Sequence, residues 1–598
     1  MHFVPYRSRS KLHKNPFGAV KAGEELALRV IFPRHMRCRG VTLQWGDYDG
    51  AWEQLLPFFW EGMQGEHEEW WQCRLVVPEP GLFRYRFIYS SDYGPGVVGH
   101  EGRGAGCIGE GAYWQLTAYD PALVLPEWLR GGVLYQIFPD RFCNSGQPRQ
   151  DVPDDRVLRP DWDGVPQWKP DAQGKITQYD FFGGDLRGIA QKLDYLVSLS
   201  VTCIYLNPIF FAESNHRYDT ADYMRIDPLL GGEQDFRFFC DEAHKRGIYV
   251  ILDGVFSHTG AKSVYFEQAQ ASKESQFYDW YIFNEWPQSY ASWWGIDILP
   301  ELREEHPAVL DFFTGENGVA RHWLRAGADG WRIDVADELP DIFLDRLFQA
   351  AKSEKPDSYI LGEVWEDASC KYSHGGRRRF LLGEQMHSVM NYPLANAILR
   401  FARKAEAEQL AELVLSQLEH YPPCAIDGLM NHIGTHDTPR ILNRLADGEE
   451  HGRVDTKLSP ELLAIARKRL KLCAALQYTL PGNPCVYYGD EAGLQGAMDP
   501  FNRACYPWGR EDKELLALYC MLGALRRDYI LGDFELISAA LGCIAYHRKS
   551  IVVIANANPH EINYRLAEGL RGCKVLFGGK LSGCEVEINA ETACVLEV

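Results

Sequence analysis

An arginine and an aspartate stand two residues apart in GADGWRIDVADE, residues 327–338, which otherwise has the character of an apolar strand. Side chains alternate along a strand, so Arg332 and Asp334 point to the same face. Burying charged groups costs free energy unless they are paired or used in chemistry. A structural ion pair explains these two residues taken alone, so a role in chemistry requires further partners.

Such partners occur at the ends of three similar apolar segments. ILGEVW delivers Glu363, IGTHDT delivers His436 and Asp437, and DGVFSH delivers Asp253 and His258. Cleavage of a glycosidic bond needs two carboxyl groups in different surroundings, because one acts as a base or nucleophile and the other protonates the leaving oxygen. The pattern therefore indicates a glycoside hydrolase.

The surroundings of the two carboxyl groups suggest their roles. Arg332 should hold Asp334 in its charged form, which suits a nucleophile that attacks the anomeric carbon. Glu363 stands among apolar residues in the sequence, which predicts a raised pKa and suits a general acid and base. These apolar neighbours are Leu361, Val364 and Trp365.

Eight apolar, β-branched segments recur through the middle of the chain, most of them separated by helix-like segments. Nearly continuous apolar strands that alternate with helices are typical of a parallel sheet covered on both faces. Eight such units predict an α/β fold of the (β/α)₈ barrel type, whose active site lies at the carboxyl ends of the strands. The segments are residues 132–139, 201–208, 247–256, 329–336, 359–365, 388–393, 429–437 and 483–491.

The flanking regions predict two β-domains. Residues 1–122 contain short alternating runs with Gly and Pro between them, as in a β-sandwich. Residues 123–515 form the predicted barrel, with a short insert at about 259–300 that would wall one side of the cleft, and residues 516–598 form a C-terminal β-sandwich domain. Five tryptophans of the first region suit the sandwich core, contacts between domains or a sugar platform: Trp45, Trp52, Trp60, Trp70 and Trp71.

At these motifs the chain resembles the alpha-amylase superfamily of retaining glycoside hydrolases, on its neopullulanase, cyclomaltodextrinase and amylopullulanase side. The resemblance spans roughly residues 130–510 and is specific in combination, although each motif alone is weak. It rests on DGVFSH, GWRIDVADE, GEVW and GTHD, together with YQIFPDRF, SNHRYDTADY, VMNYP and YYGDEAGLQGAMDPFNRACYPWG.

The resemblance implies a role for individual residues. Asp334 would be the nucleophile, Glu363 the acid and base, and Asp437 a third carboxylate that holds the distorted sugar. The N-terminal region would correspond to a starch-binding-like module. The remaining implied substrate contacts are Tyr218, His258, Arg332, His436, Asp499 and Arg503.

Some positions depart from the family pattern. Ser257 stands in DGVFSH where relatives often have a calcium-binding asparagine, and Glu366 stands where many have histidine. The resemblance implies no cofactor for the chemistry, but it leaves open a structural calcium bound through Asn144 and Asp185. Asp185 is equally well explained as a helix N-cap.

Composition limits the partners and the location. The net charge of −20 argues against nucleic acid and anionic membranes. We find no run of about 18 uncharged apolar residues and no secretory signal pattern, so no membrane partner is expected. The 16 cysteines are scattered singly, which predicts free thiols and a cytoplasmic protein. The expected partner is an α-glucan oligosaccharide or polysaccharide, and the chain is expected to be a monomer or a homodimer.

Two other functions stay open on the sequence. A glycosyltransferase of the same superfamily would share the first chemical step, and a carbohydrate-binding protein would keep the barrel without catalysis. The three intact carboxylates favour a hydrolase acting on α-1,4 bonds of maltooligosaccharides, pullulan or cyclodextrins. The share of α-1,6 cleavage is not determined by the sequence.

Overall fold

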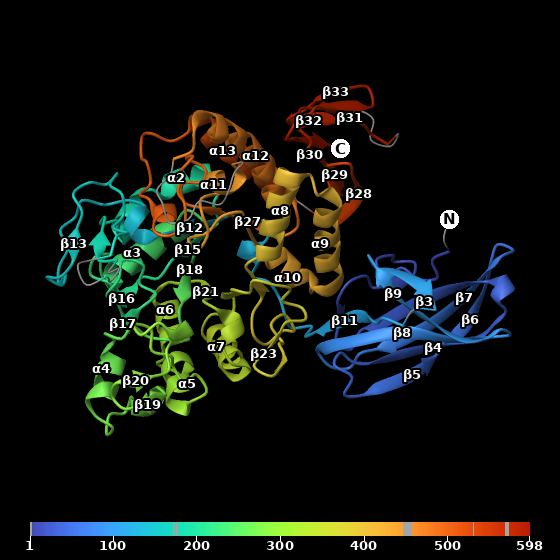
Figure 1. The fold of residues 1–598 in the computed structure, drawn as a ribbon, viewed down its shortest axis with the longest axis horizontal. Helices are drawn as coiled ribbons and strands as arrows, with labels where there is room; N and C mark the ends of the chain where they lie inside the picture. Colours follow the sequence, from blue (N-terminus) through green and yellow to red (C-terminus); the bar gives the residue numbers. More distant parts are fainter. Residues whose placement is uncertain are drawn as a thin grey trace. The chain divides into compact units, whose positions relative to one another are not determined.

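The computed structural model describes residues 3–109, 111–170, 174, 178–446, 457–529, 532–567 and 573–598. These residues form two compact units. One comprises Met1–Val124, Asp367–Ser388 and Glu412–Ile426, and the other comprises Leu125–Glu366, Val389–Ala411 and Asp427–Val598. Figure 1 shows the elements of both, and each unit is described by itself below.

Eight parallel strands form the barrel, one in each of the eight predicted segments (Figure 1). A parallel bridge between Met390 and Met430 joins the two ends of the sheet, so the barrel is nearly closed. The prediction of an α/β barrel is confirmed. In the order of the sheet the strands are β25 (Ser388–Val389), β22 (Tyr359–Gly362), β21 (Gly330–Ile333), β18 (Tyr249–Gly254), β15 (Cys203–Leu206), β12 (Leu134–Ile137), β27 (Asn483–Tyr487) and β26 (Met430–His432).

The barrel strands are buried on both faces because helices cover their outer side. All four residues of β12, β15, β21 and β22 are buried. Helices that precede barrel strands include α3 (Glu233–His244), α6 (Val319–Ala326), α7 (Asp341–Glu354) and α12 (Pro460–Thr479). A sheet enclosed in this way needs apolar residues at successive positions, which explains the continuous runs in the sequence.

Helix α6 illustrates how the sequence positions the catalytic strand. Its buried side includes Val319, Trp323 and Leu324, and it ends at Gly327, whose φ of 129° favours glycine. A Cβ atom at Gly327 would lie 2.8 Å from the Cβ of Cys240 in α3. The chain therefore turns tightly here and enters β21 within three residues.

The predicted insert contains regular structure. It holds α4 (Val264–Ala271), the short strands β19 (Phe283–Glu285) and β20 (Ser289–Tyr290), and two 3₁₀ turns, Tyr278–Trp280 and Trp293–Gly295. Its aromatic residues pack on one another, as in the stacked pair Phe266 and Phe283, whose ring centroids are 5.9 Å apart. The insert is therefore a packed unit that presents residues 293–299 to the cavity described below.

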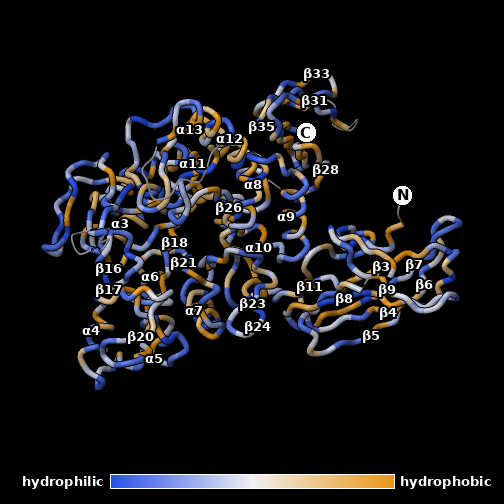
Figure 2. The backbone as a smooth tube through the Cα atoms, viewed as in Figure 1, coloured by the Kyte–Doolittle hydropathy of each residue, from blue (hydrophilic) through white to orange (hydrophobic). Residues whose placement is uncertain are grey.

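The N-terminal region is a sandwich of two antiparallel-rich sheets. One has the order β1 (Lys14–Asn15), β3, β7, β6 (Phe59–Gln64). The other has the order β10 (Ala105–Ile108), β9 (Gly94–Gly102), β8, β11 (Trp114–Tyr119), β2 (Val20–Lys21), and β4 and β5 (Glu53–Pro57) also belong to it. Its longest strands are β3 (Glu25–Pro33), β4 (Cys38–Asp47), β7 (Glu68–Val76) and β8 (Gly81–Ser91). Figure 2 shows hydrophobic and hydrophilic stretches along these strands, as expected when one face of each sheet is buried.

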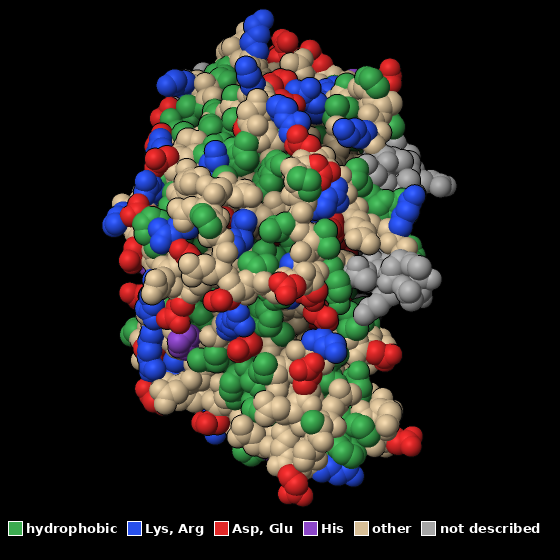
Figure 3. Space-filling view, turned by 90° about the vertical axis from the view of Figure 1, so that its left-hand side faces the viewer, with side chains coloured by type: hydrophobic (Ala, Val, Ile, Leu, Met, Phe, Trp, Pro, Cys, Tyr) green, Lys and Arg blue, Asp and Glu red, His purple; other side chains and the backbone are tan. Residues whose placement is uncertain are grey.

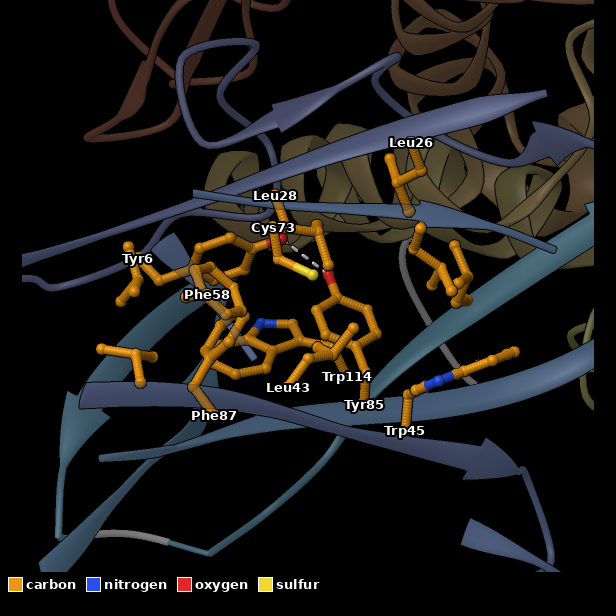
Figure 4. Close-up of a cluster of buried hydrophobic side chains, with 14 of the residues drawn as sticks. Tyr6, Leu26, Leu28, Leu43, Trp45, Phe58, Cys73, Tyr85, Phe87 and Trp114 are labelled. Atoms are coloured by element: carbon orange, nitrogen blue, oxygen red, sulfur yellow. Dashed lines mark hydrogen bonds between the residues drawn. The ribbon is translucent and has the colours of Figure 1, made fainter. Parts of the chain in front are cut away.

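Aromatic side chains fill the core between the two sheets (Figure 4). Tyr85 stacks on Trp114 with ring centroids 5.6 Å apart, and the hydroxyl groups of Tyr6 and Tyr85 are hydrogen bonded at 2.8 Å. Trp45 and Trp71 belong to this core, so two of the five tryptophans considered for a sugar platform are structural.

The C-terminal region begins with α13 (Lys513–Asp528) and continues as strands. A five-stranded sheet and a three-stranded sheet share a small apolar core. The first has the order β28 (Phe534–Ala540), β29 (Cys543–Arg548), β30 (Ile551–Asn556), β35 (Thr592–Glu597), β32 (Lys574–Phe577), and the second the order β31 (Ile562–Arg565), β34 (Glu585–Ile588), β33 (Lys580–Ser582). On the face of the molecule drawn in Figure 3, acidic and basic side chains are interspersed. That distribution suits a solvated surface and offers no large basic patch on this face.

Candidate functional site

Arg332 lies at the centre of the site and pairs with three carboxylates. Its Nη1 atom is 2.6 Å from Oδ1 of Asp253 and 2.7 Å from Oδ1 of Asp334, while Nη2 is 2.7 Å from Oε2 of Glu363. The guanidinium is fully buried, and its planar fork fixes the directions of the carboxylates it touches. The spacing Arg332-x-Asp334 therefore does place both side chains on one face of the barrel.

Glu363 has more polar surroundings than its sequence neighbours predict. Besides Arg332, its Oε2 accepts a hydrogen bond from the backbone N–H of Val335 at 2.9 Å, and its Oε1 accepts one from the indole of Trp365 at 3.0 Å. The apolar frame expected from the sequence is wrong for this carboxylate. Groups from β21 and from its own loop replace that frame.

Val335 adopts an unusual backbone conformation beside these groups. Its φ of 39° and ψ of 49° lie in the left-handed region, which is strained for a β-branched residue. The turn directs its N–H group at Glu363 immediately after Asp334 leaves β21. Val335 thus orients the carboxyl group of Glu363, and it does so directly after Asp334 in the chain.

A second network orients Tyr218 beneath the same carboxylates. Its hydroxyl donates to Oδ2 of Asp253 at 2.8 Å and accepts from the amide of Asn207 at 3.0 Å. Tyr205 also donates to Oδ2 of Asp253, at 2.6 Å. Asp253 therefore ties Arg332 to the Tyr218 ring, and it is fully buried below the cavity.

His436 is held in one tautomer by its neighbours. The amide nitrogen of Gln136 lies 2.8 Å from its Nδ1, and Tyr218 Oη lies 2.5 Å from its Nε2. Because the amide nitrogen can only donate, Nδ1 accepts and Nε2 carries the proton. Burial and the nearby Arg503 lower the pKa of His436 well below its usual value, so the ring is neutral. The ring lies parallel to that of Tyr218 at 5.3 Å.

Asp437 and the pair Asp499–Arg503 continue this wall. Asp437 Oδ1 is 3.1 Å from His436 Nε2, and Arg503 is 3.1 Å from Asp499. The Arg503 guanidinium also donates to the carbonyl of His436 at 3.1 Å. These contacts fix the loop after β26 against the segment that follows β27.

His258 lies on the opposite side, next to the insert. Its Nδ1 is 2.9 Å from the hydroxyl of Ser257, its Nε2 is 3.2 Å from the carbonyl of Tyr218, and its ring centroid is 5.4 Å from that of Trp293. Burial lowers its pKa to about 4. Ser257 thus orients this histidine in the structure.

Two tryptophans from the insert form the wall beyond His258. The indoles of Trp293 and Trp294 stack with centroids 5.0 Å apart, and both N–H groups donate to the carboxylate of Glu338, at 2.6 and 2.9 Å. Trp294 is 77% exposed, so one ring face stays open. The expected wall is therefore present, and Glu338 from the 3₁₀ turn after β21 holds it.

All these elements border one cavity of about 750 Å³ at the carboxyl ends of the barrel strands. Eight of the nine residues predicted to be catalytic or to contact sugar line it, and the ninth, Arg332, lies buried beneath. The eight are Tyr218, His258, Asp334, Glu363, His436, Asp437, Asp499 and Arg503. A cavity of this size with a few converging polar groups is what a small-molecule site requires.

The cluster contains more acids than bases. Burial raises the pKa of Asp253 and Asp334, although Arg332 opposes the shift in both. Burial and the neighbouring Glu363 raise the pKa of Asp437 to about 7. Three carboxylates share the one positive charge of Arg332, and Asp437 lies near them, so the surroundings of these groups oppose full ionisation, as a site with one protonated and one ionised carboxyl group needs.

Several residues of the site were missed by the sequence analysis. Gln136, Tyr205 and Glu338 lie in or beside motifs, but their roles depend on partners 300, 48 and 45 residues away. His216, which lines the cavity, stands in the motif SNHRYDTADY and was passed over. Only the position of Gln136 on a barrel strand could have drawn attention to it.

Comparison with known proteins identifies the family. A model of the alpha amylase catalytic domain matches residues 136–517. The chain belongs to the alpha-amylase family. It is 33% identical to a cyclomaltodextrinase of Geobacillus thermopakistaniensis over 93% of this chain and 91% of that protein. It is 34% identical to an amylopullulanase of Thermoanaerobacter thermohydrosulfuricus over 90% of this chain, but it spans only 40% of that longer protein.

A solved structure also aligns over the whole length. The type III pullulan hydrolase from Thermococcus kodakarensis superimposes with a TM-score of 0.71 at 28% identity, covering 100% of both chains. The likeness extends to the β-rich regions that precede and follow the alpha-amylase barrel in the sequence. Among the described residues of this alpha-amylase family chain, no helix has the length and apolar character needed to span a membrane.

The calcium site that the alpha-amylase resemblance left open does not fit the residues present. Asp185 is the N-cap of α1 (Leu186–Gln191), and its Oδ1 accepts from Gly188 N at 2.6 Å. Its Oδ2 accepts from the hydroxyl of Ser145 at 2.8 Å and from Arg149 at 3.1 Å. Asn144 Oδ1 accepts from Gly146 N at 2.8 Å. Both side chains thus already accept hydrogen bonds. The positively charged guanidinium of Arg149 lies between them and the space that a calcium ion would need.

Proposed function

We propose that this chain hydrolyses α-1,4 glucosidic bonds of maltooligosaccharides, cyclodextrins and pullulan, with retention of configuration. The observation that carries the proposal is the pair of carboxylates on one guanidinium, Asp334 and Glu363 on Arg332, at 2.7 Å each. Two carboxylates bound to neighbouring nitrogens are close together, which favours the retaining separation of about 5–5.5 Å over the longer inverting one.

The proposed reaction has two steps. In the first, Asp334 attacks the anomeric carbon as a carboxylate, a form that Arg332 favours although burial raises the pKa of Asp334. Glu363 gives its proton to the leaving oxygen, so that a covalent glycosyl-enzyme forms and the aglycone departs. In the second, Glu363 takes a proton from water, whose oxygen attacks the same carbon and releases Asp334. Asp437 and the neutral His436 would bind hydroxyl groups of the sugar, and the Tyr218 ring would lie against its apolar face.

The names of the relatives support the substrate class. They include cyclomaltodextrinase, amylopullulanase and pullulan hydrolase. We also propose that the chain cleaves some α-1,6 bonds. This proposal draws support from the amylopullulanase similarity and from an open cavity wall at Trp294, which is 77% exposed.

Product analysis tests the proposal. Maltohexaose and pullulan are incubated separately with the chain, and the products are separated. We expect shorter maltooligosaccharides from the first. Panose from pullulan means α-1,4 cleavage, and maltotriose means α-1,6 cleavage. NMR of the first-formed product should show the α-anomer. A β-anomer appearing first, or no product from either glucan, would contradict the proposal.

A transferase would be recognised in the same experiment. At high maltohexaose concentration a hydrolase yields mainly new reducing ends, whereas a transferase yields longer oligosaccharides without a matching gain of reducing ends. We also propose a cytoplasmic location, since the described cysteines, sixteen in number, are all free thiols. Fractionation of the producing cells tests that location, and sedimentation distinguishes a monomer from a homodimer.

A further inference from the structure

An arginine occupies the place between the residues that would hold calcium. Arg149 lies on the loop between β12 and β13 (Val157–Leu158), and its side chain is 15% exposed. Its Nη2 atom donates to the carbonyl of Gly183 and to Oδ2 of Asp185, and its Nε donates to the carbonyl of Leu229 at 2.8 Å. Two backbone carbonyls and a carboxylate are the oxygen types that a calcium ion takes as ligands.

The side of this guanidinium that faces Gly183 is closely filled. Gly183 has a φ of 80°, and a Cβ atom built on it would lie 3.1 Å from Asn144 Nδ2 and 3.3 Å from Arg149 Nη2. Asn144 presents its amide nitrogen here, because its oxygen accepts from Gly146 N. The N–H group of the Asn144 amide can donate to neighbouring oxygen atoms, but it cannot bind a metal ion.

The charge balance leads to the same result. Asp185 is paired with Arg149 at 3.1 Å, and its Oδ2 also accepts from Ser145. A divalent ion added beside the pair would lie a few ångströms from the fixed positive charge of Arg149, and like charges at such distances repel. The ion and Arg149 would also have to share the one carboxylate of Asp185. We propose that the Arg149 guanidinium is the resident cation of this loop and that the chain binds no calcium between Asn144 and Asp185.

The segment contacted by Arg149 is connected to the substrate cavity through a series of hydrogen bonds and one ion pair. The N–H groups of Phe182 and Gly183 donate to the carboxylate of Asp140, at 3.0 and 3.1 Å. Asp140 pairs with Arg141 at 2.7 Å, and Arg141 donates to the carbonyl of Arg503 at 2.8 Å. Arg149 therefore stabilises, through Gly183, the chain of contacts that reaches the cavity residue Arg503, as a bound metal ion would.

Thermal unfolding and calcium binding of the full chain test the proposal independently of its activity. We expect the same Tm in calcium chloride and in excess EDTA, and no heat of binding when calcium chloride is titrated into EDTA-treated protein. Stoichiometric calcium binding with a Tm several degrees higher would overturn the proposal.

Substitutions at position 149 test the guanidinium itself. Arg149→Ala should lower the Tm by several degrees, because three acceptors lose their donor. Arg225→Ala is the matched control: it removes one positive charge from an exposed side chain that lies over the Phe211 ring at 4.7 Å. It should shift the Tm by a much smaller amount. Equal shifts in the two variants would show that only net charge matters and would overturn the proposal.

A gain of function gives the sharpest comparison. Arg149→Asn removes the guanidinium and its positive charge, and its shorter side chain leaves the space beside Asp185 and the carbonyl of Gly183 free. We expect calcium to raise the Tm of this variant while leaving the wild type unchanged. If calcium leaves the asparagine variant unchanged as well, the guanidinium is not what excludes the ion, and the proposal fails.

Discussion

At the scale of residues, Arg332 organises the proposed chemistry. It contacts Asp253 and Glu363 as well as Asp334, so the loss of one partner leaves it with two. Removing a single carboxylate charge should therefore disturb the reaction far more than the fold.

Asp334→Asn tests this separation of catalysis from stability. We expect hydrolysis of maltohexaose to fall by at least about three orders of magnitude, since the attacking group is lost. The free energy of unfolding should change by less than about 2 kcal/mol, because two carboxylates still compensate the buried guanidinium. Release of reducing ends and urea denaturation measure the two effects. Activity within a few-fold of wild type would remove Asp334 from the mechanism.

His258 makes stability depend on pH. Burial lowers its pKa from 6.5 to about 4. Below pH 6.5 the unfolded chain binds a proton at this residue and the folded chain does not, so its contribution to stability is present above that pH and is lost as the pH falls. The loss amounts to about 2 kcal/mol between pH 6.5 and about 5. In His258→Gln, urea denaturation at both pH values should show a smaller loss. An unchanged pH dependence would contradict the buried, neutral histidine.

At the scale of elements, the insert between β18 and α5 (Pro307–Thr314) supplies the stacked tryptophans of the cavity wall. Glu338 belongs to the 3₁₀ turn after β21, so the wall and the proposed nucleophile are connected through one short segment. The exposed indole ring of Trp294, held by Glu338, is a preorganised surface for a sugar ring, because little side-chain entropy is lost on binding.

Trp294→Ala should weaken substrate binding with little effect on the chemical step. We expect KM for maltohexaose to rise about three- to tenfold, with kcat within a factor of about two, in line with the loss of one aromatic contact. Glu338→Gln should raise KM less, because its amide oxygen can still accept from one of the two indoles. Tyr93→Ala is the control, since Tyr93 is 75% exposed and does not line the cavity. A similar rise in KM for the control would show that the wall has no specific role.

The elements were predicted better than the contacts between them. All eight barrel strands lie within their predicted segments, because a doubly covered strand must be apolar at successive positions and such runs are visible in a sequence. The environment of Glu363 was missed because Val335 N–H and the Arg332 fork reach it from another strand. Gln136 was missed for the same reason, since its partner His436 is 300 residues away. Sequence patterns show which face a residue takes, whereas a contact depends on the closed barrel.

At the scale of the whole molecule, the described cysteines are sixteen free thiols, nine of them buried. Burial raises the pKa of several of them, for example that of Cys143 to about 11. Such thiols pack as small apolar side chains and are weak nucleophiles at neutral pH. The stability of the chain should therefore owe nothing to disulfide bonds.

Unfolding with and without a reducing agent tests this expectation. The Tm should be the same in dithiothreitol as in its absence, and thiol titration of the denatured, unreduced chain should find all sixteen groups. The folded chain should react with fewer, because the buried thiols are shielded. A lower Tm in dithiothreitol, or missing thiols after denaturation, would reveal disulfide bonds in the protein as isolated.

The guanidinium that contacts Gly183 and Asp185 also bears on how the chain reaches its folded state. A metal ion must be acquired from solution, and its occupancy falls when the ion is diluted or chelated. Arg149 is joined covalently to the chain that it braces, so its effective concentration is set by a loop of about 35 residues and does not depend on the surroundings. The chain therefore carries this cation from the moment of synthesis, and it can complete the loop beside its cavity wherever it folds, whatever the local supply of ions.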